Sequence, residues 1–312
     1  MKISILNHCY FTPEHIEQLK EMGEVVEYPN TTSASDAVSN IGDAEIAIGD
    51  CFEFPMNKEF FDTAKSLKFL SLNTTGFDIV DIGAAKERGI KISNLPGFST
   101  EAVAEHALAM MFGLSKKLII GNEIMHIKPF QLNPANRAHD EYIGMSLRGK
   151  TVGVIGLGKI GSRIAELGNG IGMKVIGYNR TPKQLPNVTG VEIDGLIKSS
   201  DVIVLAMAFN EDLRNFIDKD AISKMRKSVI IINVGRGEFI NEKDLIEALD
   251  EDRIAGFGAD VIADWSVNNP LFKCKNVILT PHFAFLTDES LKNMADIIVS
   301  NVRLARTPKV AC

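Results

Sequence analysis

The sequence predicts an α/β protein with two doubly wound domains, each built on a parallel sheet. The chain has 312 residues, which is more than one compact core usually contains. Short β-type runs alternate with helical patterns almost from end to end, and this alternation is typical of parallel sheets. The alternation breaks around Ser99 and resumes at Thr151, so the elements fall into two sets.

In the first set we expect strands over residues 2–6, 23–28, 44–48, 69–72 and 91–93, and helices over 13–22 and 57–66. Thr12-Pro13 and Met56-Asn57 suit the starts of these helices. Ser99-Thr100-Glu101 predicts the start of a nearly all-apolar helix over 102–114, which is typical of a buried helix packed between domains. The stretch 121–149 shows little periodicity, and so long a connection is usually functional or contacts a partner chain.

In the second set we expect strands over residues 151–155, 174–178, 201–206, 228–233, 254–259 and 277–280. One last helix is expected over 289–306. We find no internal repeat and no low-complexity segment.

Composition excludes several classes of function. The formal net charge is -6 and no Lys/Arg-rich run is present, which argues against nucleic acid as a partner. We expect no membrane span and no signal peptide, because the apolar stretches are too short. The four cysteines, Cys9, Cys51, Cys274 and Cys312, are scattered without a CxxC pair, which predicts reduced thiols, no metal site and a cytoplasmic protein.

A glycine-rich turn marks a candidate cofactor site. The apolar strand 151–155 leads directly into Gly156-Leu157-Gly158-Lys159-Ile160-Gly161, which is followed by a helical run. This is the G-x-G-x-x-G pattern, whose glycines let the backbone approach a pyrophosphate at a helix N-terminus. We therefore predict dinucleotide binding at Gly156, Gly158, Lys159, Ile160 and Gly161. The alternatives are a glycine turn without a phosphate ligand or a methyltransferase-like fold.

The end of the next strand bears on the choice between NAD and NADP. An acidic residue there would accept hydrogen bonds from the ribose hydroxyls and repel a 2′-phosphate. The sequence has Asn179, Arg180 and Thr181 instead, and an arginine pairs well with a phosphate. We favour NADP, and NAD stays the alternative if Arg180 is only a solvated surface charge.

Three polar residues follow predicted strands of the second set, where ligands of open parallel sheets bind. Arg236 lies between Gly235 and a further glycine, and a guanidinium there is suited to a carboxylate and a carbonyl. Asp260 is suited to accept a hydrogen bond from a carboxamide. His282 is suited to deliver a proton near neutral pH.

Together these segments resemble the D-2-hydroxyacid dehydrogenase family, in its glycerate dehydrogenase and hydroxypyruvate–glyoxylate reductase-like branch. The resemblance extends over nearly the whole chain, through the glycine turn, Arg236, Asp260, His282 and the blocks TGFDIVD (75–81), AAKERGI (84–90), NLPG (94–97), VAEH (103–106) and LRGK (147–150).

The resemblance implies a Rossmann NAD(P)-binding domain over 99–283, inserted into a flavodoxin-like substrate domain formed by 1–98 and 284–312. It implies a homodimer in which the segment around 121–149 reaches the partner. By position, Arg236 holds the substrate, His282 is the acid/base, and Asp260 and Gly235 contact the cofactor. The backbone N–H groups of Thr75 and Gly76 would bind the substrate carboxylate.

One departure from the family concerns the partner of the histidine. The family usually has a glutamate about five residues after the aspartate matched by Asp260, where it hydrogen-bonds the histidine and raises its pKa. Here position 265 is Trp265, preceded by Asp264. Either Asp264 takes the role of this glutamate or His282 is less basic and the pH optimum of reduction moves down.

These residues predict an oxidoreductase that transfers a hydride between NAD(P)H and a small 2-keto acid, with glyoxylate and hydroxypyruvate as the first candidates. The stretch 48–53 offers no basic group for a phosphorylated substrate. The alternatives are a dinucleotide-sensing protein without turnover and a same-fold enzyme that oxidises formate or phosphite.

Overall fold

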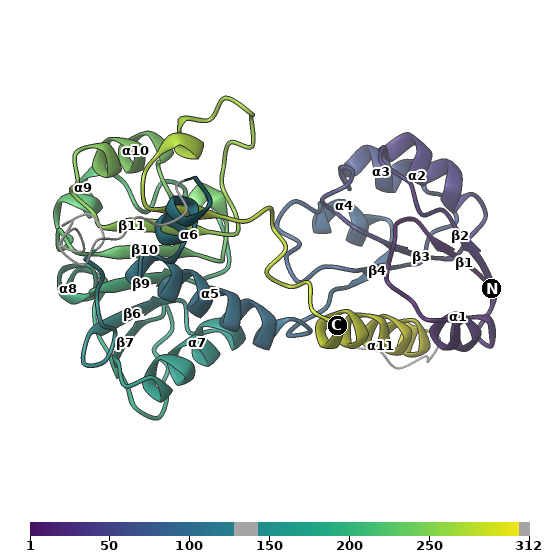
Figure 1. Cartoon of the computed structure of the whole chain (residues 1–312). Helices are drawn as coiled ribbons and strands as arrows, with labels where there is room; N and C mark the ends of the chain where they lie inside the picture. Colours follow the sequence, from purple (N-terminus) through teal and green to yellow (C-terminus); the bar gives the residue numbers. More distant parts are fainter. Residues whose placement is uncertain (128–142, 306–312) are drawn as a thin grey trace. The chain divides into compact units, whose positions relative to one another are not determined.

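The computed structural model describes residues 1–127 and 143–305, which form two compact units. Unit 1 consists of Met1–Ser99 and Leu286–Cys312, and unit 2 consists of Thr100–Phe285. Both units contain a parallel sheet with helices packed on it, so the predicted fold class is confirmed (Figure 1).

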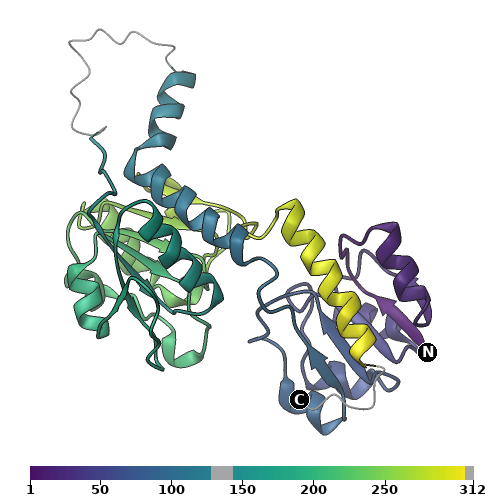
Figure 2. The ribbon, with the colours of Figure 1, turned by 90° about the horizontal axis from the view of Figure 1, so that it is seen from below.

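Unit 1 has a five-stranded sheet in the order β2-β1-β3-β4-β5, with every neighbouring pair parallel. The strands are β1 (Lys2–Ile5), β2 (Glu24–Glu27), β3 (Ile46–Gly49), β4 (Phe69–Leu72) and β5 (Lys91–Ser93). One face is covered by α2 (Ala34–Ile41), α3 (Lys58–Thr63) and α4 (Ile82–Glu87), and the other by α1 (Pro13–Lys20) and α11 (Asp288–Ala305). Figure 2 shows α11, in yellow, beside α1.

Local capping explains where the helices of unit 1 begin. Thr12 accepts a hydrogen bond from the backbone of His15, and the His15 side chain accepts one from the backbone of Thr12, so α1 begins with a reciprocal cap. Asn57 caps α3 in the same position, as the sequence predicted. The other ring nitrogen of His15 lies 3.1 Å from Asp296 of α11, which ties the two helices on this face together.

Unit 2 has a seven-stranded sheet in the order β12-β11-β10-β9-β6-β7-β8. The strands are β6 (Thr151–Ile155), β7 (Lys174–Tyr178), β8 (Val188–Gly190), β9 (Val202–Leu205), β10 (Ile230–Asn233), β11 (Gly256–Ala259) and β12 (Val277–Leu279). The chain runs outward from β6 in both directions, so the strand order reverses between β6 and β9. Ligands of open parallel sheets bind at the carboxyl edge of such a reversal.

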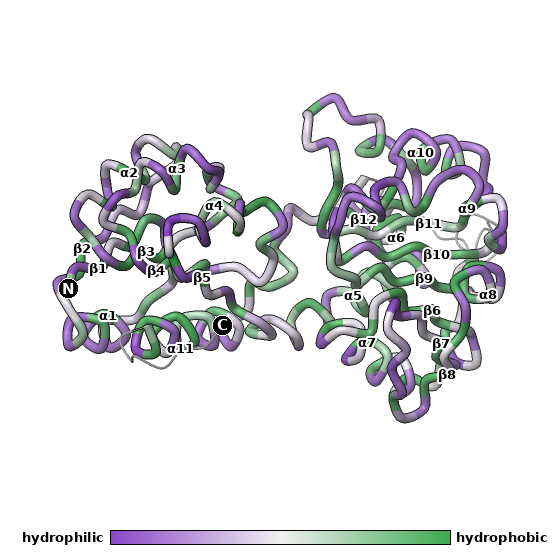
Figure 3. The backbone as a smooth tube through the Cα atoms, turned by 180° about the vertical axis from the view of Figure 1, so that it is seen from behind, coloured by the Kyte–Doolittle hydropathy of each residue, from purple (hydrophilic) through white to green (hydrophobic). Residues whose placement is uncertain are grey.

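Two separate apolar cores lie on the two faces of this sheet. The first is built with α5 (Thr100–Ser115) and α7 (Lys159–Gly170), and the second with α8 (Ile193–Ser199), α9 (Lys219–Ser223) and α10 (Glu242–Asp250). In β9 and β10 every residue is buried because side chains of both faces are covered. Figure 3 shows both strands as mainly hydrophobic; the last residue of β10, Asn233, is polar.

The prediction of an aperiodic stretch over 121–149 is wrong at its start. Helix α6 (Leu118–Ile127) includes residues 121–127, while 128–142 lie outside the described residues. The helix is apolar on most sides and leaves Leu118, Ile119 and Met125 exposed, so it lacks the alternation of faces that marks an amphipathic helix. Strand β8 was also missed, because three residues are too few to show a period.

None of the helices in 1–127 and 143–305 is long and apolar enough to cross a membrane. Across the same residues there is no cluster of three or more His, Cys, Asp or Glu side chains arranged to hold a metal ion.

Candidate active site

The glycine turn of unit 2 joins the carboxyl end of β6 to α7. Gly156 has a φ of 93°, in the region that favours glycine, and a side chain at Gly161 would collide with the carbonyl oxygen of Gly156. Gly158 is the N-cap of α7 but supplies no side-chain hydrogen bond to the first turn, and open space surrounds the position of its missing Cβ. The turn therefore offers helix N–H groups and room for a close approach, which fits a dinucleotide pyrophosphate.

The segment after β7 folds back onto this turn. Asn179 Oδ1 accepts a hydrogen bond from the backbone of Leu157 at 3.1 Å, and its amide donates to the carbonyl of Thr181. Lys183 Nζ donates to Leu157 O at 2.8 Å and to Ser162 Oγ at 3.1 Å. Asn179 thus connects two loops, and Lys183 brings a positive charge to the first turn of α7, close to Arg180 along the chain.

A buried asparagine organises the segment that carries Arg236. Asn233, the last residue of β10, is fully buried; its Oδ1 accepts from the N–H of Gly235 and its Nδ2 donates to the carbonyl of Arg236. The Arg236 guanidinium donates to Gly235 O at 3.0 Å, and the side chain is half-buried. The turn is therefore shaped by Asn233, and Arg236 is held at the carboxyl edge of the sheet.

Asp260 lies just after β11 and holds the segment that carries His282. Its carboxylate is 3% exposed and accepts hydrogen bonds from Thr280 Oγ1 at 2.6 Å, Phe283 N at 3.0 Å and Ala284 N at 2.9 Å. Its backbone carbonyl accepts a further one from His282 N. A buried carboxylate needs such partners, and two of its three donors here are consecutive backbone amides.

His282 has a φ of 55°, a left-handed conformation that costs a residue with a side chain roughly 1–2 kcal/mol. The hydrogen bonds to Asp260 offset this cost. Protein atoms around the ring lower the pKa of the imidazole, although solvent still reaches the residue; the charge of Asp260 raises this pKa and the charge of Arg236 lowers it. Arg236 and Asp260 therefore both act on His282, and the three residues follow three adjacent strands, β10, β11 and β12.

Asp264 lies on an exposed loop and caps its own turn. Its oxygens accept hydrogen bonds from Ser266 N at 2.8 Å and Ser266 Oγ at 2.9 Å. Glu242, at the start of α10, holds this loop by accepting from Ala263 N, Asp264 N and Asn269 Nδ2. Trp265 is 49% exposed. The charge of Asp260 raises the pKa of His282, whereas the Asp264 carboxylate is engaged by Ser266.

In unit 1, Thr75 and Gly76 follow β4 at the carboxyl edge of the sheet. Thr75 Oγ1 donates to Leu95 O, and the carbonyl of Thr75 accepts from Asn94 Nδ2, so this loop is tied to the segment after β5. Among the hydrogen bonds within residues 1–127 and 143–305, none uses the backbone N–H of Thr75 or Gly76. These two donors are therefore available for an anion.

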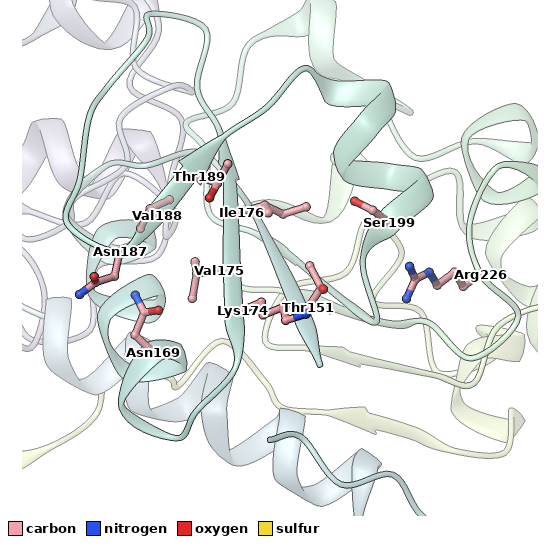
Figure 4. Close-up of a pocket in the computed structure, with 10 residues that line it drawn as sticks. All are labelled: Thr151, Asn169, Lys174, Val175, Ile176, Asn187, Val188, Thr189, Ser199 and Arg226. Carbon is pink, nitrogen blue, oxygen red and sulfur yellow. The ribbon is translucent and has the colours of Figure 1, made fainter. Parts of the chain in front are cut away.

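A hollow in unit 2 lies at the amino ends of the strands, at the edge of the sheet opposite the glycine turn (Figure 4). Its lining includes Thr151 and Lys174, the first residues of β6 and β7, together with Asn169, Ser199 and Arg226. None of the predicted site residues lines it, and ligands of open parallel sheets bind beyond the carboxyl ends of the strands. The glycine turn therefore stays the candidate site, and this hollow is not part of it.

Sequence reasoning missed four residues that shape the site: Lys183, Asn233, Glu242 and Thr280. The sequence does contain a signal for Lys183, because it is a second cation three residues after Arg180 and before the next strand. The other three act through hydrogen bonds to loops whose course only the fold determines.

A family model described as D-isomer specific 2-hydroxyacid dehydrogenase, NAD binding domain, matches residues 108–284. The chain is 33% identical over 311 residues to a hydroxypyruvate reductase of Blautia hydrogenotrophica, covering 97% of this chain and 96% of the relative. It is 32% identical over 252 residues to a glyoxylate reductase of Thermococcus litoralis, covering 79% and 76%.

Among solved structures, the chain is similar to an acyclic imino acid reductase in complex with NADPH and D-Arg. The TM-score is 0.88 at 29% sequence identity, and the match covers 97% of this chain and 96% of the other. The sequence and the fold are therefore matched over almost the whole length.

Proposed function

The chain belongs to the D-isomer specific 2-hydroxyacid dehydrogenase family, and from that premise we propose that it reduces glyoxylate or hydroxypyruvate to the 2-hydroxy acid with NADPH. It is a nicotinamide dinucleotide-dependent oxidoreductase, and the family relation favours this activity over the sensing protein. The observation that carries the proposal is the group Arg236, Asp260 and His282 on adjacent strands of the sheet that also bears the glycine turn.

Each residue has a distinct part in this mechanism. The bound nicotinamide supplies the hydride. The Arg236 guanidinium binds the 2-keto acid, and the protonated His282 imidazole donates a proton to the carbonyl oxygen as it is reduced. Asp260 keeps the His282 segment in place, and its negative charge favours the protonated imidazole. In unit 1, the N–H groups of Thr75 and Gly76 bind a substrate carboxylate.

A small, unphosphorylated substrate is supported by the charge of unit 1. The segment after β3 carries Asp50, whose pKa is raised by burial, and no basic side chain lies between residues 46 and 53. A phosphorylated substrate carries extra negative charge and needs a cation to bind it. Glyoxylate and hydroxypyruvate bear a single carboxylate, for which the two backbone donors suffice.

NADPH is supported by two cations on one loop. Arg180 and Lys183 both follow β7, and Lys183 already contacts Ser162 at the start of α7. The position of the family's acidic residue is Asn179, which is engaged with the glycine turn. A ribose 2′-phosphate would bind Arg180, Thr181 and Lys183, whereas a free 2′-hydroxyl would meet the amide of Asn179 in place of a carboxylate that accepts its hydrogen bond.

The decisive experiment is oxidation of NADPH and NADH by the purified protein against glyoxylate, hydroxypyruvate and pyruvate. We expect turnover that is lost in His282→Ala and a preference for NADPH that falls at least about tenfold in Arg180→Asp and in Lys183→Asp. Lys227→Asp is the matched control, because Lys227 follows Arg226, which lines the hollow at the amino ends of the strands. Absence of turnover with clear NADPH binding would contradict the reductase, and an unchanged cofactor ratio would contradict the 2′-phosphate site.

Reduction of a 2-imino acid is a second candidate, favoured by the lowered pKa of His282. A protonated imine already carries its proton on nitrogen, so hydride addition completes the reduction without a proton from His282. The likeness to an acyclic imino acid reductase points the same way. NADPH oxidation with glyoxylate should then accelerate on addition of methylamine, whereas a pure keto acid reductase would show no acceleration.

A homodimer is supported by exposed apolar side chains on α5 and α6. Phe112, Leu118, Ile119 and Met125 are between 36% and 57% exposed, and such a group of side chains is typical of a surface covered by a second copy. A mass of twice the chain in solution would support this, and a monomer would contradict it.

We place the protein in the cytoplasm, where reduced dinucleotide is available. Fractionation of cells tests this location.

A further inference from the structure

His106 lies on the buried helix α5 and contacts the segment that carries His282. Its Nε2 is 2.9 Å from Thr280 Oγ1, and its ring packs edge-on against the ring of Phe283, with centroids 5.6 Å apart and an interplanar angle of 83°. The side chain is 20% exposed. Both contacts are made to residues that flank His282 within two positions.

The direction of the hydrogen bonds follows from the chemistry of the groups. Thr280 Oγ1 lies 2.6 Å from Asp260 Oδ1, and a hydroxyl so close to a carboxylate must donate its one hydrogen to it. Thr280 can then only accept from His106, so the hydrogen of the neutral imidazole is on Nε2. Burial lowers the pKa of His106, which favours this neutral form.

The result is a chain of hydrogen bonds that runs from His106 through Thr280 to Asp260. Asp260 in turn accepts from the amides of Phe283 and Ala284 and, with its carbonyl, from that of His282. Because His282 has a φ of 55°, its conformation depends on these contacts. Each donor that fixes the Asp260 carboxylate therefore also fixes the His282 backbone.

We propose that His106 is a positioning residue for His282, acting through Thr280 and Asp260. The proposal rests on the acid/base role of His282 proposed above. Since a displaced proton donor slows the chemical step more than it weakens substrate binding, loss of the chain should lower kcat and leave KM nearly unchanged.

Matched pairs of variants test this role. Thr280→Val removes the hydroxyl and Thr280→Ser keeps it; His106→Leu removes the donor and His106→Gln keeps an N–H at a similar reach. We expect kcat to fall up to about tenfold in Thr280→Val and His106→Leu, each of which removes a hydrogen bond of the chain, with near wild-type kcat in the conservative variants. The double variant should lose no more than either single one, because both break the same chain.

Amide hydrogen exchange at Phe283 and Ala284, measured without substrate, gives a readout independent of activity. Exchange should be faster in Thr280→Val and His106→Leu and unchanged in Thr280→Ser. Wild-type kcat and wild-type exchange in Thr280→Val and His106→Leu, or additive losses in the double variant, would overturn the positioning role. If Thr280→Val does not fold, the His106 pair supplies the same comparison.

These outcomes separate the inference from the proposed function. If wild-type protein turns over no 2-keto acid but exchange at Phe283 and Ala284 still responds to the variants, the reductase fails and the structural link stands. If wild-type protein is active and neither kcat nor exchange responds, the link fails and the reductase stands.

Discussion

At the scale of single residues, two aspartates compete for the role of the family's missing glutamate. Asp260 is buried below the His282 segment, and its charge raises the pKa of the imidazole. Asp264 is exposed, and both its oxygens accept from Ser266. We therefore propose that Asp260 supplies the electrostatic part of that role, whereas Asp264 shapes its own loop.

Replacing Asp260 by asparagine should lower the pKa of His282, because a nearby negative charge stabilises the imidazolium. Reduction needs the protonated imidazole, so the pH optimum of kcat/KM for reduction should move down. The measurement is the pH profile of NADPH oxidation, with circular dichroism to verify folding. Asp264→Asn is the matched control and should keep the wild-type profile; a shift in this variant and none in Asp260→Asn would reverse the assignment.

At the scale of elements, the glycine turn shows two different reasons for a missing side chain. Gly161 is required by the fold, because a Cβ would collide with the carbonyl of Gly156. Gly158 is not required by packing, because its Cβ would meet nothing within 4 Å. The open space at Gly158 is therefore best explained by a ligand whose phosphate approaches the backbone.

Alanine at each position should separate these reasons. Gly161→Ala should destabilise unit 2 by about 1–3 kcal/mol, the usual cost of overpacking. Gly158→Ala should leave the thermal unfolding of the free protein unchanged but weaken NADPH binding at least about tenfold, since the methyl group occupies the approach of the pyrophosphate. Thermal scans and a fluorescence titration with NADPH measure both, and wild-type affinity in Gly158→Ala would place the pyrophosphate elsewhere.

At the scale of the whole molecule, each unit has its own apolar core, and the dinucleotide is proposed to bind unit 2. When two units unfold independently, a ligand stabilises only the unit to which it binds, by about 2.7 kcal/mol at a hundred times its Kd. Trp265, the only tryptophan of the chain, belongs to unit 2 and reports on this unit alone.

NADPH should therefore raise the midpoint of unfolding followed by Trp265 fluorescence more than the midpoint followed by far-ultraviolet circular dichroism, which reports on both units. Gly158→Ala should reduce the difference at the same NADPH concentration. Equal shifts of both signals at every concentration would show that the two units unfold together.

The sequence was sufficient wherever the signal is local. The apolar strand before Gly156, the helix after Gly161 and the strand that ends at Tyr178 lie close together along the chain, so their spacing alone predicted the cofactor turn. Strands such as Phe69–Leu72 were predicted to the residue because a buried parallel strand is a short, continuous apolar run. Because these strands could be recognised locally, the sequence also predicted that Arg236, Asp260 and His282 lie at the ends of strands.

Only the tertiary structure decided which partners these residues have. Asp260 and Thr280 are 20 positions apart and His106 and Thr280 are 174 apart, and nothing in the local pattern predicts that their side chains form one hydrogen-bonded chain. Likewise, the family resemblance made Asp264 a candidate partner of His282. In the structure, Glu242 holds the loop of Asp264, and the Asp264 carboxylate accepts hydrogen bonds from Ser266. Composition and periodicity determine which strands form. The order of the strands in the sheet determines which loops come together. Each hydrogen bond between these loops depends on distances of a few ångströms between segments that are remote in sequence, so only the tertiary structure decides it.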